Sequence, residues 1–157
     1  MVNVVNGQVL IAGGIRSISL STVWSYDITG ARWSALSPMT NARQRHGCTH
    51  FNHDGSDKVV VAGGTGDGLL TLDSVEIYDP GLNTWTNGPS LPLPISHLKL
   101  FLVSGTVWAL GGVEGQARTT RSTKIYSLRS DLSGWDEQAV GFPDGLVHGA
   151  TLVFNEP

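Results

Sequence analysis

Three histidines recur along the chain at a constant spacing. His46, His97 and His148 each lie 51 residues from the next. Neutral imidazoles are good ligands for transition metals, so three of them brought together from distant parts of the chain could form a metal site. Equal spacing, however, indicates a repeated structural unit, and a repeat distributes such side chains around a ring instead of gathering them. We therefore expect no metal and no cofactor at these positions.

The single cysteine, Cys48, lies two residues after His46. Arg43, Arg45 and His46 could lower the pKa of its thiol and make it reactive, but we expect a small buried residue here. One cysteine cannot form an internal disulfide, and the first five residues lack the charged and apolar regions of a secretory signal. Both features favour a reducing compartment, and we expect a cytoplasmic protein.

Composition and motifs argue against several functions. A net charge of -3 and a pI near 5.9 are unlike a general nucleic-acid binder, which would be strongly basic. Apolar stretches such as Leu98 to Val103 are too short to cross a bilayer. The sequence has no phosphate-binding loop, no HExxH motif and no Ser-His-Asp order. We expect a protein that is not an enzyme and has no catalytic residues.

Four residue types recur in the same order three times: a Gly-Gly pair after a short apolar run, a tyrosine, a tryptophan and a histidine. Glycines allow close packing, and large aromatic rings fill the wedge between adjacent units, so we expect these positions to be structural. The repeated glycines and aromatic residues are Gly13, Gly14, Tyr26 and Trp33, then Gly63, Gly64, Tyr78 and Trp85, then Gly111, Gly112, Tyr126 and Trp135.

Each unit predicts four short strands. The apolar run before the glycines is typical of a strand buried on both faces. A hairpin signal precedes it, as in Asp54-Gly55, and two further strands carry the tyrosine and the tryptophan. In the third unit the tryptophan follows the tyrosine by 9 residues instead of 7, and we attribute the difference to residues 130–134 in the last turn.

This pattern resembles the kelch repeat, which has a period of about 50 residues and folds as a four-stranded blade of a β-propeller. The resemblance implies an all-β chain with three blades of antiparallel strands, in a single kelch-repeat domain over residues 1–157. The repeats span about residues 1–45, 46–96 and 97–146, and residues 147–157 would form the innermost strand of a further blade. Only Arg43 matches the arginine that kelch repeats carry before the innermost strand.

The strand order also predicts which loops share a surface. In an antiparallel meander, the connection between the second and third strands and the connection to the next blade emerge on the same side. We call this surface the loop face; it comprises about residues 15–22, 39–46, 65–73, 89–97, 113–122 and 141–148. Five arginines fall on it: Arg16, Arg43, Arg45, Arg118 and Arg121.

Arginine captures carboxylates through two parallel hydrogen bonds. Kelch proteins commonly hold a partner on this face, so the resemblance implies that a partner protein or peptide binds here. We expect an acidic segment, and neither nucleic acid nor a membrane. The resemblance also implies an adaptor role like that of some ubiquitin ligase components.

Two alternatives stay open. Some kelch-type propellers are enzymes; the copper centre of galactose oxidase and the iron-binding Glu-x-x-x-Asp-x-x-x-His run of nitrile-specifier proteins have no counterpart here, but an acid-base activity like that of a sugar mutarotase is not excluded. The other alternative is a structural scaffold.

Three blades fall short of the four to eight that close a propeller, so we expect a homodimer with six blades. The rival interpretation is a fragment of a longer propeller.

Overall fold

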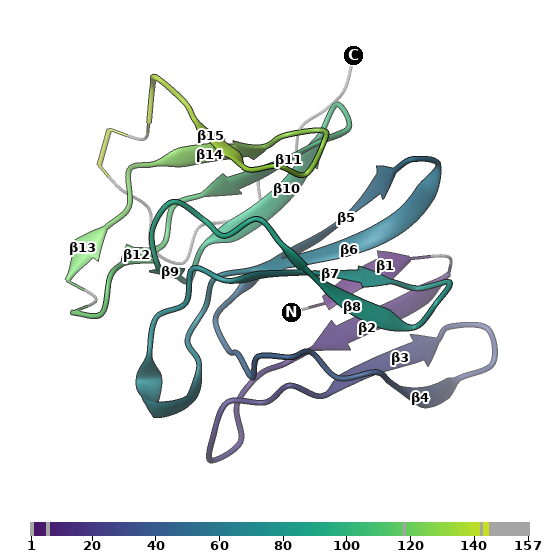
Figure 1. Ribbon diagram of the computed structural model, residues 1–157. Helices are drawn as coiled ribbons and strands as arrows, with labels where there is room; N and C mark the ends of the chain where they lie inside the picture. Colours follow the sequence, from purple (N-terminus) through teal and green to yellow (C-terminus); the bar gives the residue numbers. More distant parts are fainter. Residues whose placement is uncertain (1, 6, 118, 142, 145–157) are drawn as a thin grey trace.

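Three antiparallel sheets of four strands follow one another along the chain, and each forms a blade (Figure 1). The computed structural model describes residues 2–5, 7–117, 119–141 and 143–144. In Figure 1 the first blade is purple, the second blue to teal, and the third green to yellow. The predicted all-β architecture with three four-stranded blades is confirmed.

The strands of every blade pair in sequence order, beginning with the innermost one. The first blade contains β1 (Val2–Val5), β2 (Gln8–Ala12), β3 (Val23–Asp27) and β4 (Arg32–Leu36). The second contains β5 (Gly47–His53), β6 (Ser56–Ala62), β7 (Val75–Asp79) and β8 (Thr84–Gly88). The third contains β10 (Lys99–Val103), β11 (Thr106–Leu110), β14 (Ile125–Leu128) and β15 (Trp135–Glu137).

Smaller elements lie in the connections between these strands. A three-stranded sheet joins β9 (Ile95–Ser96), β12 (Val113–Glu114) and β13 (Thr120–Arg121), and the 3-10 helix η1 spans Asp67–Leu69. Within the described part of the chain, no helix is long and apolar enough to cross a membrane.

The core lies between successive blades, and β6 contributes to both of its halves. Val59 and Val61 pack against the first blade, whereas Val60 and Ala62 pack against the third, and all four are 0% exposed. Successive side chains of a strand point to opposite faces, so an uninterrupted apolar run is what a strand covered on both sides requires.

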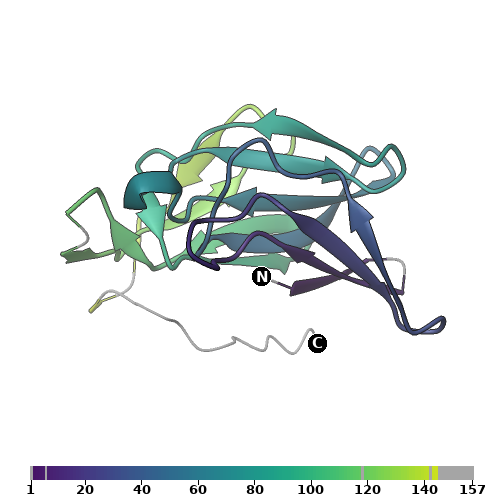
Figure 2. The same cartoon turned by 90° about the horizontal axis from the view of Figure 1, so that it is seen from below.

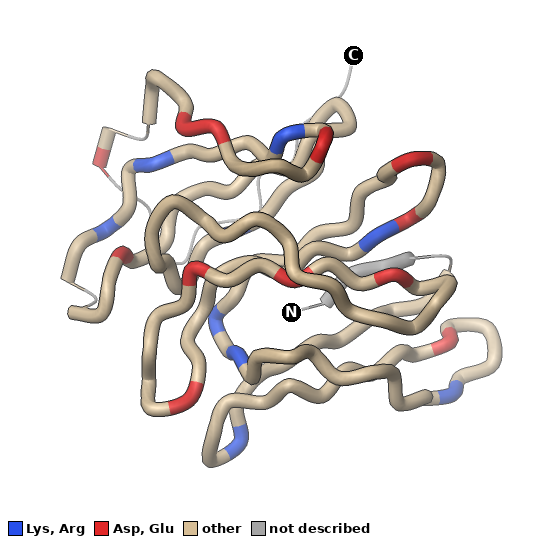
Figure 3. The backbone as a smooth tube through the Cα atoms, in the orientation of Figure 1, with Lys and Arg blue, Asp and Glu red and all other residues tan. Residues whose placement is uncertain are grey.

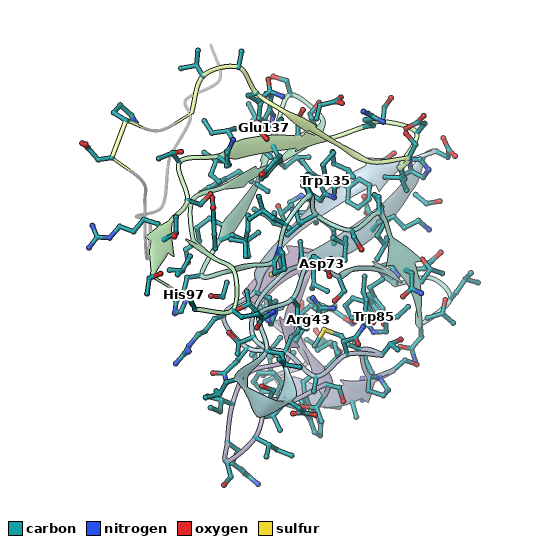
Figure 4. All side chains as sticks on the ribbon, turned by 60° about the vertical axis from the view of Figure 1, so that its left-hand side comes forward. Arg43, Asp73, Trp85, His97, Trp135 and Glu137 are labelled. Carbon is teal, nitrogen blue, oxygen red and sulfur yellow. The ribbon has the colours of Figure 1, made fainter. Side chains whose placement is uncertain are left out.

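A tryptophan of each later blade hydrogen-bonds to the linker that leaves the blade before it (Figure 4). The Trp85 indole N–H donates to the carbonyl of Ser37 at 2.8 Å, and that of Trp135 donates to the carbonyl of Pro89 at 2.9 Å. Tyr78 packs on Trp85 with ring centroids 4.9 Å apart. The aromatic residues thus join neighbouring blades at their outer edges.

The linkers between blades cross close over the Gly-Gly pairs. Gly63 has a φ of +62°, and a Cβ atom there would lie 2.3 Å from the carbonyl oxygen of Ile95. A Cβ atom on Gly13 would lie 2.4 Å from the carbonyl oxygen of Arg43. Only glycine combines this backbone angle with so close an approach.

Tyr126 does not occupy the position of the other two repeat tyrosines. Tyr26 lies opposite Trp33 in the first blade, and Tyr78 lies opposite Trp85 in the second. In the third blade Leu128 lies opposite Trp135. Tyr126, two residues earlier, lies opposite Glu137, so its prediction as an equivalent of Tyr26 and Tyr78 is wrong.

The two extra residues of the third blade lie before the tyrosine, not after it. Leu72 N–H donates to the carbonyl of Gly64, whereas the corresponding bond of the third blade runs from Ser122 to Gly112, two residues further along. The last turn closes with a bond from Arg129 N–H to the carbonyl of Gly134 and has the length of its counterparts. Placing the insertion at residues 130–134 was therefore wrong.

His46 and His97 are not equivalent either. Gly47 pairs with Ala62, directly before Gly63, and Lys99 pairs with Leu110, directly before Gly111. The repeat here is thus 52 residues, which aligns His46 with Leu98 and His97 with Arg45. Both Arg45 and His97 have left-handed backbone angles, with φ of +55° and +62°. His148 lies outside the described residues.

Candidate functional site

Three of the connections assigned to the loop face project to one side of the blades (Figure 2), whereas most of residues 141–148 lie outside the described residues. Figure 2 shows the β2–β3 loop, the β6–β7 loop with η1, and the β12–β13 pair on the left, while the hairpin turns point to the right. These loops continue directly from the apolar strands of each blade, so the packed core determines their spacing.

Side chains cross-link the three loops. The Ser19 hydroxyl of the first loop donates to the carbonyls of Thr65 and Gly66 in the second, at 3.2 and 3.1 Å. Gln116 of the third loop donates its amide N–H to the carbonyl of Thr71 at 2.9 Å, and its amide oxygen accepts from the N–H of Thr71 at 2.8 Å. The three loops are therefore held in fixed positions relative to one another.

Arg43 is not part of the exposed surface, and its assignment to partner binding is wrong. Its side chain is buried in the interior, as Figure 4 shows, and pairs with the Glu76 carboxylate at 2.8 Å. The same guanidinium donates to the carbonyls of Gly63 and Ser74 at 2.8 and 2.9 Å. Because Arg43 is 0% exposed, its guanidinium is not accessible to a ligand on the loop face.

Glu76 is held on both sides. It accepts hydrogen bonds from the backbone N–H groups of Thr40 and Asn41 in the linker, at 2.7 and 3.0 Å, as well as from Arg43. Burial alone raises the pKa of its carboxyl group, but these hydrogen bonds outweigh burial and bring the pKa below its ordinary value. The linker between the first two blades is thus fixed by a charged anchor.

Three of the predicted arginines are exposed on the loop face. Arg16 lies in the β2–β3 loop, Arg45 precedes β5, and Arg121 ends β13. Arg118 lies outside the described residues. Arg43 and Arg45 are two residues apart in the sequence, but the backbone of Arg45 takes a left-handed angle and only the side chain of Arg43 is buried.

Acidic residues lie among these arginines. Asp67 and Asp73 are exposed on the β6–β7 loop and Glu114 is half-buried on β12. Figure 3 shows blue and red segments alternating along this side. The loop face therefore carries separate exposed arginines instead of one continuous basic patch.

His46 lies inside the molecule between the first two blades. It is 2% exposed, and neither ring nitrogen meets a partner in good hydrogen-bonding geometry within the described part of the chain. Burial, aided by the nearby charge of Arg43, lowers the pKa of the imidazole to about 3. The ring is neutral at physiological pH and is packed against Gly13.

Neither metal binding nor thiol reactivity finds support in the described ranges. No group of three or more His, Cys, Asp or Glu side chains there could hold a metal ion. Cys48 is 8% exposed, and burial raises the pKa of its thiol to about 11, so the thiol stays protonated at neutral pH.

Two cavities of similar size lie between the blades, on the side of the hairpin turns. One of about 270 Å³ is lined by Leu36, Tyr78 and Pro80, among others, and one of about 260 Å³ by Gly88 and Leu132. Leu36 and Gly88 end the fourth strands of successive blades. A cavity that recurs at equivalent positions is a consequence of blade packing, and we do not assign a ligand to it.

Several residues of the site were missed in the sequence. Ser19 and Gln116 are ordinary loop residues, and nothing in their spacing indicates a contact over 45 or more positions. Glu76 gives a signal, since it is a charged residue inside the apolar strand β7, and the arginine that anchors it matches the arginine of the kelch pattern.

Comparison with known proteins identifies the repeat. The family model of the Kelch motif matches residues 2–40 and 43–92. Kelch-like protein 40 of Mus musculus is 33% identical over 74% of this chain and 19% of its own length. Beta-scruin of Limulus polyphemus is 27% identical over 68% of this chain and 12% of its own length. The chain therefore spans about a fifth or less of these relatives.

A solved structure, titled "Structure of YjhT", shares the fold. It superposes with a TM-score of 0.72 over 90% of this chain and 51% of that chain, at 19% identity. At that identity the match concerns the fold alone. The third blade lies beyond the residues matched by the family model, and its strand order is nevertheless the same.

The first prediction concerns the Arg43–Glu76 pair. Arg43→Ile should lower the free energy of unfolding by about 3–5 kcal/mol, because it leaves a buried carboxylate without its counter-charge. The next linker and blade carry Ile95 and Tyr126 at the equivalent positions. The double variant Arg43→Ile/Glu76→Tyr introduces these two residues. Its free energy of unfolding should fall by about 1–3 kcal/mol less than the summed losses of Arg43→Ile and Glu76→Tyr. Urea unfolding of all four proteins gives these values; additive losses would contradict the pairing.

The second prediction concerns His46. Its folded-state pKa of about 3 lies below the ordinary value of 6.5, so the unfolded chain takes up a proton first as the pH falls. Stability from this residue is complete above pH 6.5 and should decline below it, by at most about 1.4 kcal/mol per pH unit. His46→Leu, which copies the equivalent Leu98, should show a shallower decline between pH 7 and 5. Parallel urea midpoints for both proteins would refute this.

Proposed function

Because the chain belongs to the kelch-repeat family, we propose that it is a protein-interaction module whose loop face binds a partner protein or peptide. The observation that carries this proposal is the cross-linking of three loops by Ser19 and Gln116 into one pre-ordered surface. Pre-ordered loops on a rigid scaffold are typical of binding sites. The adaptor role and a cytoplasmic location are part of the same proposal.

The charged groups of the loop face favour an acidic segment of the partner. Arg16, Arg45 and Arg121 are exposed, and they make no ion pair with another described residue. A free guanidinium can take a carboxylate through two hydrogen bonds. The carboxylates nearby restrict the sites that suit an acidic group and so contribute to specificity.

An enzymatic role has less support. His46, which precedes β5, and Cys48 on β5 are both buried in neutral form. The cavities between blades recur with the repeat and contain no convergent set of charged groups beyond the Lys58–Asp79 pair. We therefore propose that the described blades act by binding and not by catalysis.

We also propose that two copies associate. Trp24 and Trp33 on the outward side of the first blade are 43% and 52% exposed, whereas Trp135, which has a blade in front of it, is 7% exposed. Tyr26 and Trp33 hold the same 4.9 Å separation as Tyr78 and Trp85, so this face has the form that receives a preceding blade. This chain matches 51% of the propeller chain that it resembles, so two copies supply a comparable length.

The third prediction tests the exposed arginines. The double variant Arg45→Glu/Arg121→Glu should bind a panel of fluorescent acidic peptides at least about tenfold more weakly than the wild type, with almost the same melting temperature. Binding of the wild type should weaken with added salt. Arg32→Glu, an exposed arginine on β4 away from the loop face, is the matched control and should leave affinity unchanged. Equal affinity of the double variant would refute the acidic ligand.

The fourth prediction tests self-association by light scattering. The wild type at micromolar concentration should have twice the chain mass of 16.7 kDa. Trp33→Ser should shift it to the monomer, because it removes aromatic area from the interface. Ile28→Ala, in the β3–β4 turn of the same blade, should stay dimeric. A folded wild-type monomer would overturn the dimer.

A further inference from the structure

Two neighbouring tips of the loop face expose aliphatic side chains. Ile15 and Ile18 at the tip of the β2–β3 loop are 57% and 68% exposed, and Leu69 and Leu70 beside η1 are 57% and 58% exposed. They are four of the nine large hydrophobic side chains that are exposed among the described residues. We call these four residues the aliphatic tips.

The two tips lie side by side. Ser19, which follows Ile18, donates its hydroxyl to the carbonyl of Gly66, four residues before Leu70. Ile15 and Ser19 form an antiparallel bridge, which closes the first tip. The N–H of Gly66 donates to the carbonyl of Leu70 at 2.8 Å, which closes the second. In both Figure 1 and Figure 2 the two loops project in the same direction.

The second tip holds a strained backbone. Gly68 and Leu69 have successive left-handed angles, with φ of +62° and +64°. Leucine rarely adopts this conformation, and residues kept in it are often found at functional sites. In this loop the conformation leaves both leucines exposed instead of turning them into the core.

The third loop has no such tip. Its described residues, 113–117 and 119–122, include no exposed large hydrophobic side chain. Positions shared by all blades build the propeller, whereas a binding site develops where the repeats differ. The aliphatic tips are one of these differences.

We propose that the aliphatic tips bind an extended protein segment that carries paired aliphatic side chains next to a carboxylate. The carboxylate follows from Arg16, which is exposed between Ile15 and Ile18 and has no ion pair with another described residue. This assignment rests on the proposed function and specifies which chemistry the loop face selects. Aliphatic contacts supply affinity, and the guanidinium sets the orientation.

A membrane surface is the less suitable occupant. Loops that insert into anionic lipid are flanked by clusters of Lys and Arg. Here Asp67 lies two residues before Leu69, and Asp73 is exposed on the same loop. These carboxylates would oppose a negatively charged bilayer.

The test is a selection of random displayed dodecapeptides on the full chain. Enriched peptides should share two aliphatic residues beside an Asp or Glu. A synthetic copy of the most enriched peptide should bind Ile18→Asn/Leu70→Asn at least about tenfold more weakly than the wild type, because two apolar contacts are lost. Arg16→Glu should weaken it similarly. Leu82→Asn, which changes a still more exposed leucine in the β7–β8 turn, should have no effect.

The other outcomes separate this inference from the proposed function. Peptides that bind the tip variant as well as the wild type, but lose affinity in Arg45→Glu/Arg121→Glu, would overturn the aliphatic tips and leave the loop face as the binding site. Failure to enrich any peptide would overturn both. Tip-dependent sedimentation with vesicles of phosphatidylcholine and phosphatidylserine, in the absence of peptide binding, would replace the protein segment with a membrane.

Discussion

The buried guanidinium of Arg43 joins three parts of the chain that have to stay in register. It bonds to the carbonyl of Gly63 at the end of β6, to Ser74 at the start of β7, and to the carboxylate of Glu76, which in turn holds the linker at Thr40 and Asn41. Withdrawing two opposite charges from water is unfavourable unless their remaining hydrogen-bonding groups are satisfied. Because most of these groups are satisfied within one small region, the linker has little freedom, and the first two blades keep a fixed angle.

The interface between the second and third blades has no ion pair at the equivalent positions. Ile95 stands where Arg43 stands, and Tyr126 stands where Glu76 stands. The corresponding linker position also changes from Thr40 to Pro92, which has no N–H group for a carboxylate to accept from. An ion pair thus occupies these two positions at one interface, and an uncharged pair occupies them at the next. The space between adjacent blades has to be filled by side chains, but these side chains can be charged or uncharged.

The rigidity of the blades explains why the loop face can carry function. Its loops begin at strands that supply side chains to the core, and Ser19 and Gln116 link these loops to one another. Side chains at the tips, such as Ile18 and Leu70, contribute little to folding and are free to differ between repeats. The proposed binding specificity therefore depends on positions where the repeats differ from one another.

The sequence by itself determined the blades. The Gly-Gly pairs, the apolar runs and the tryptophans are local signals, and alternation along a strand decides which side chains enter the core, so the four-stranded order was predictable. Only the tertiary structure decided which residues with similar spacing occupy equivalent positions in the blades. Two extra residues lengthen the segment from Gly112 to Trp135 by the same amount whether they lie before or after the strand that pairs with Trp135. Only the pairing of Leu128 with Trp135 shows that they lie before it. Likewise, Arg43 and Arg45 look alike in sequence, but one is buried beside Glu76 and the other is exposed, because the backbone turns left-handed at Arg45.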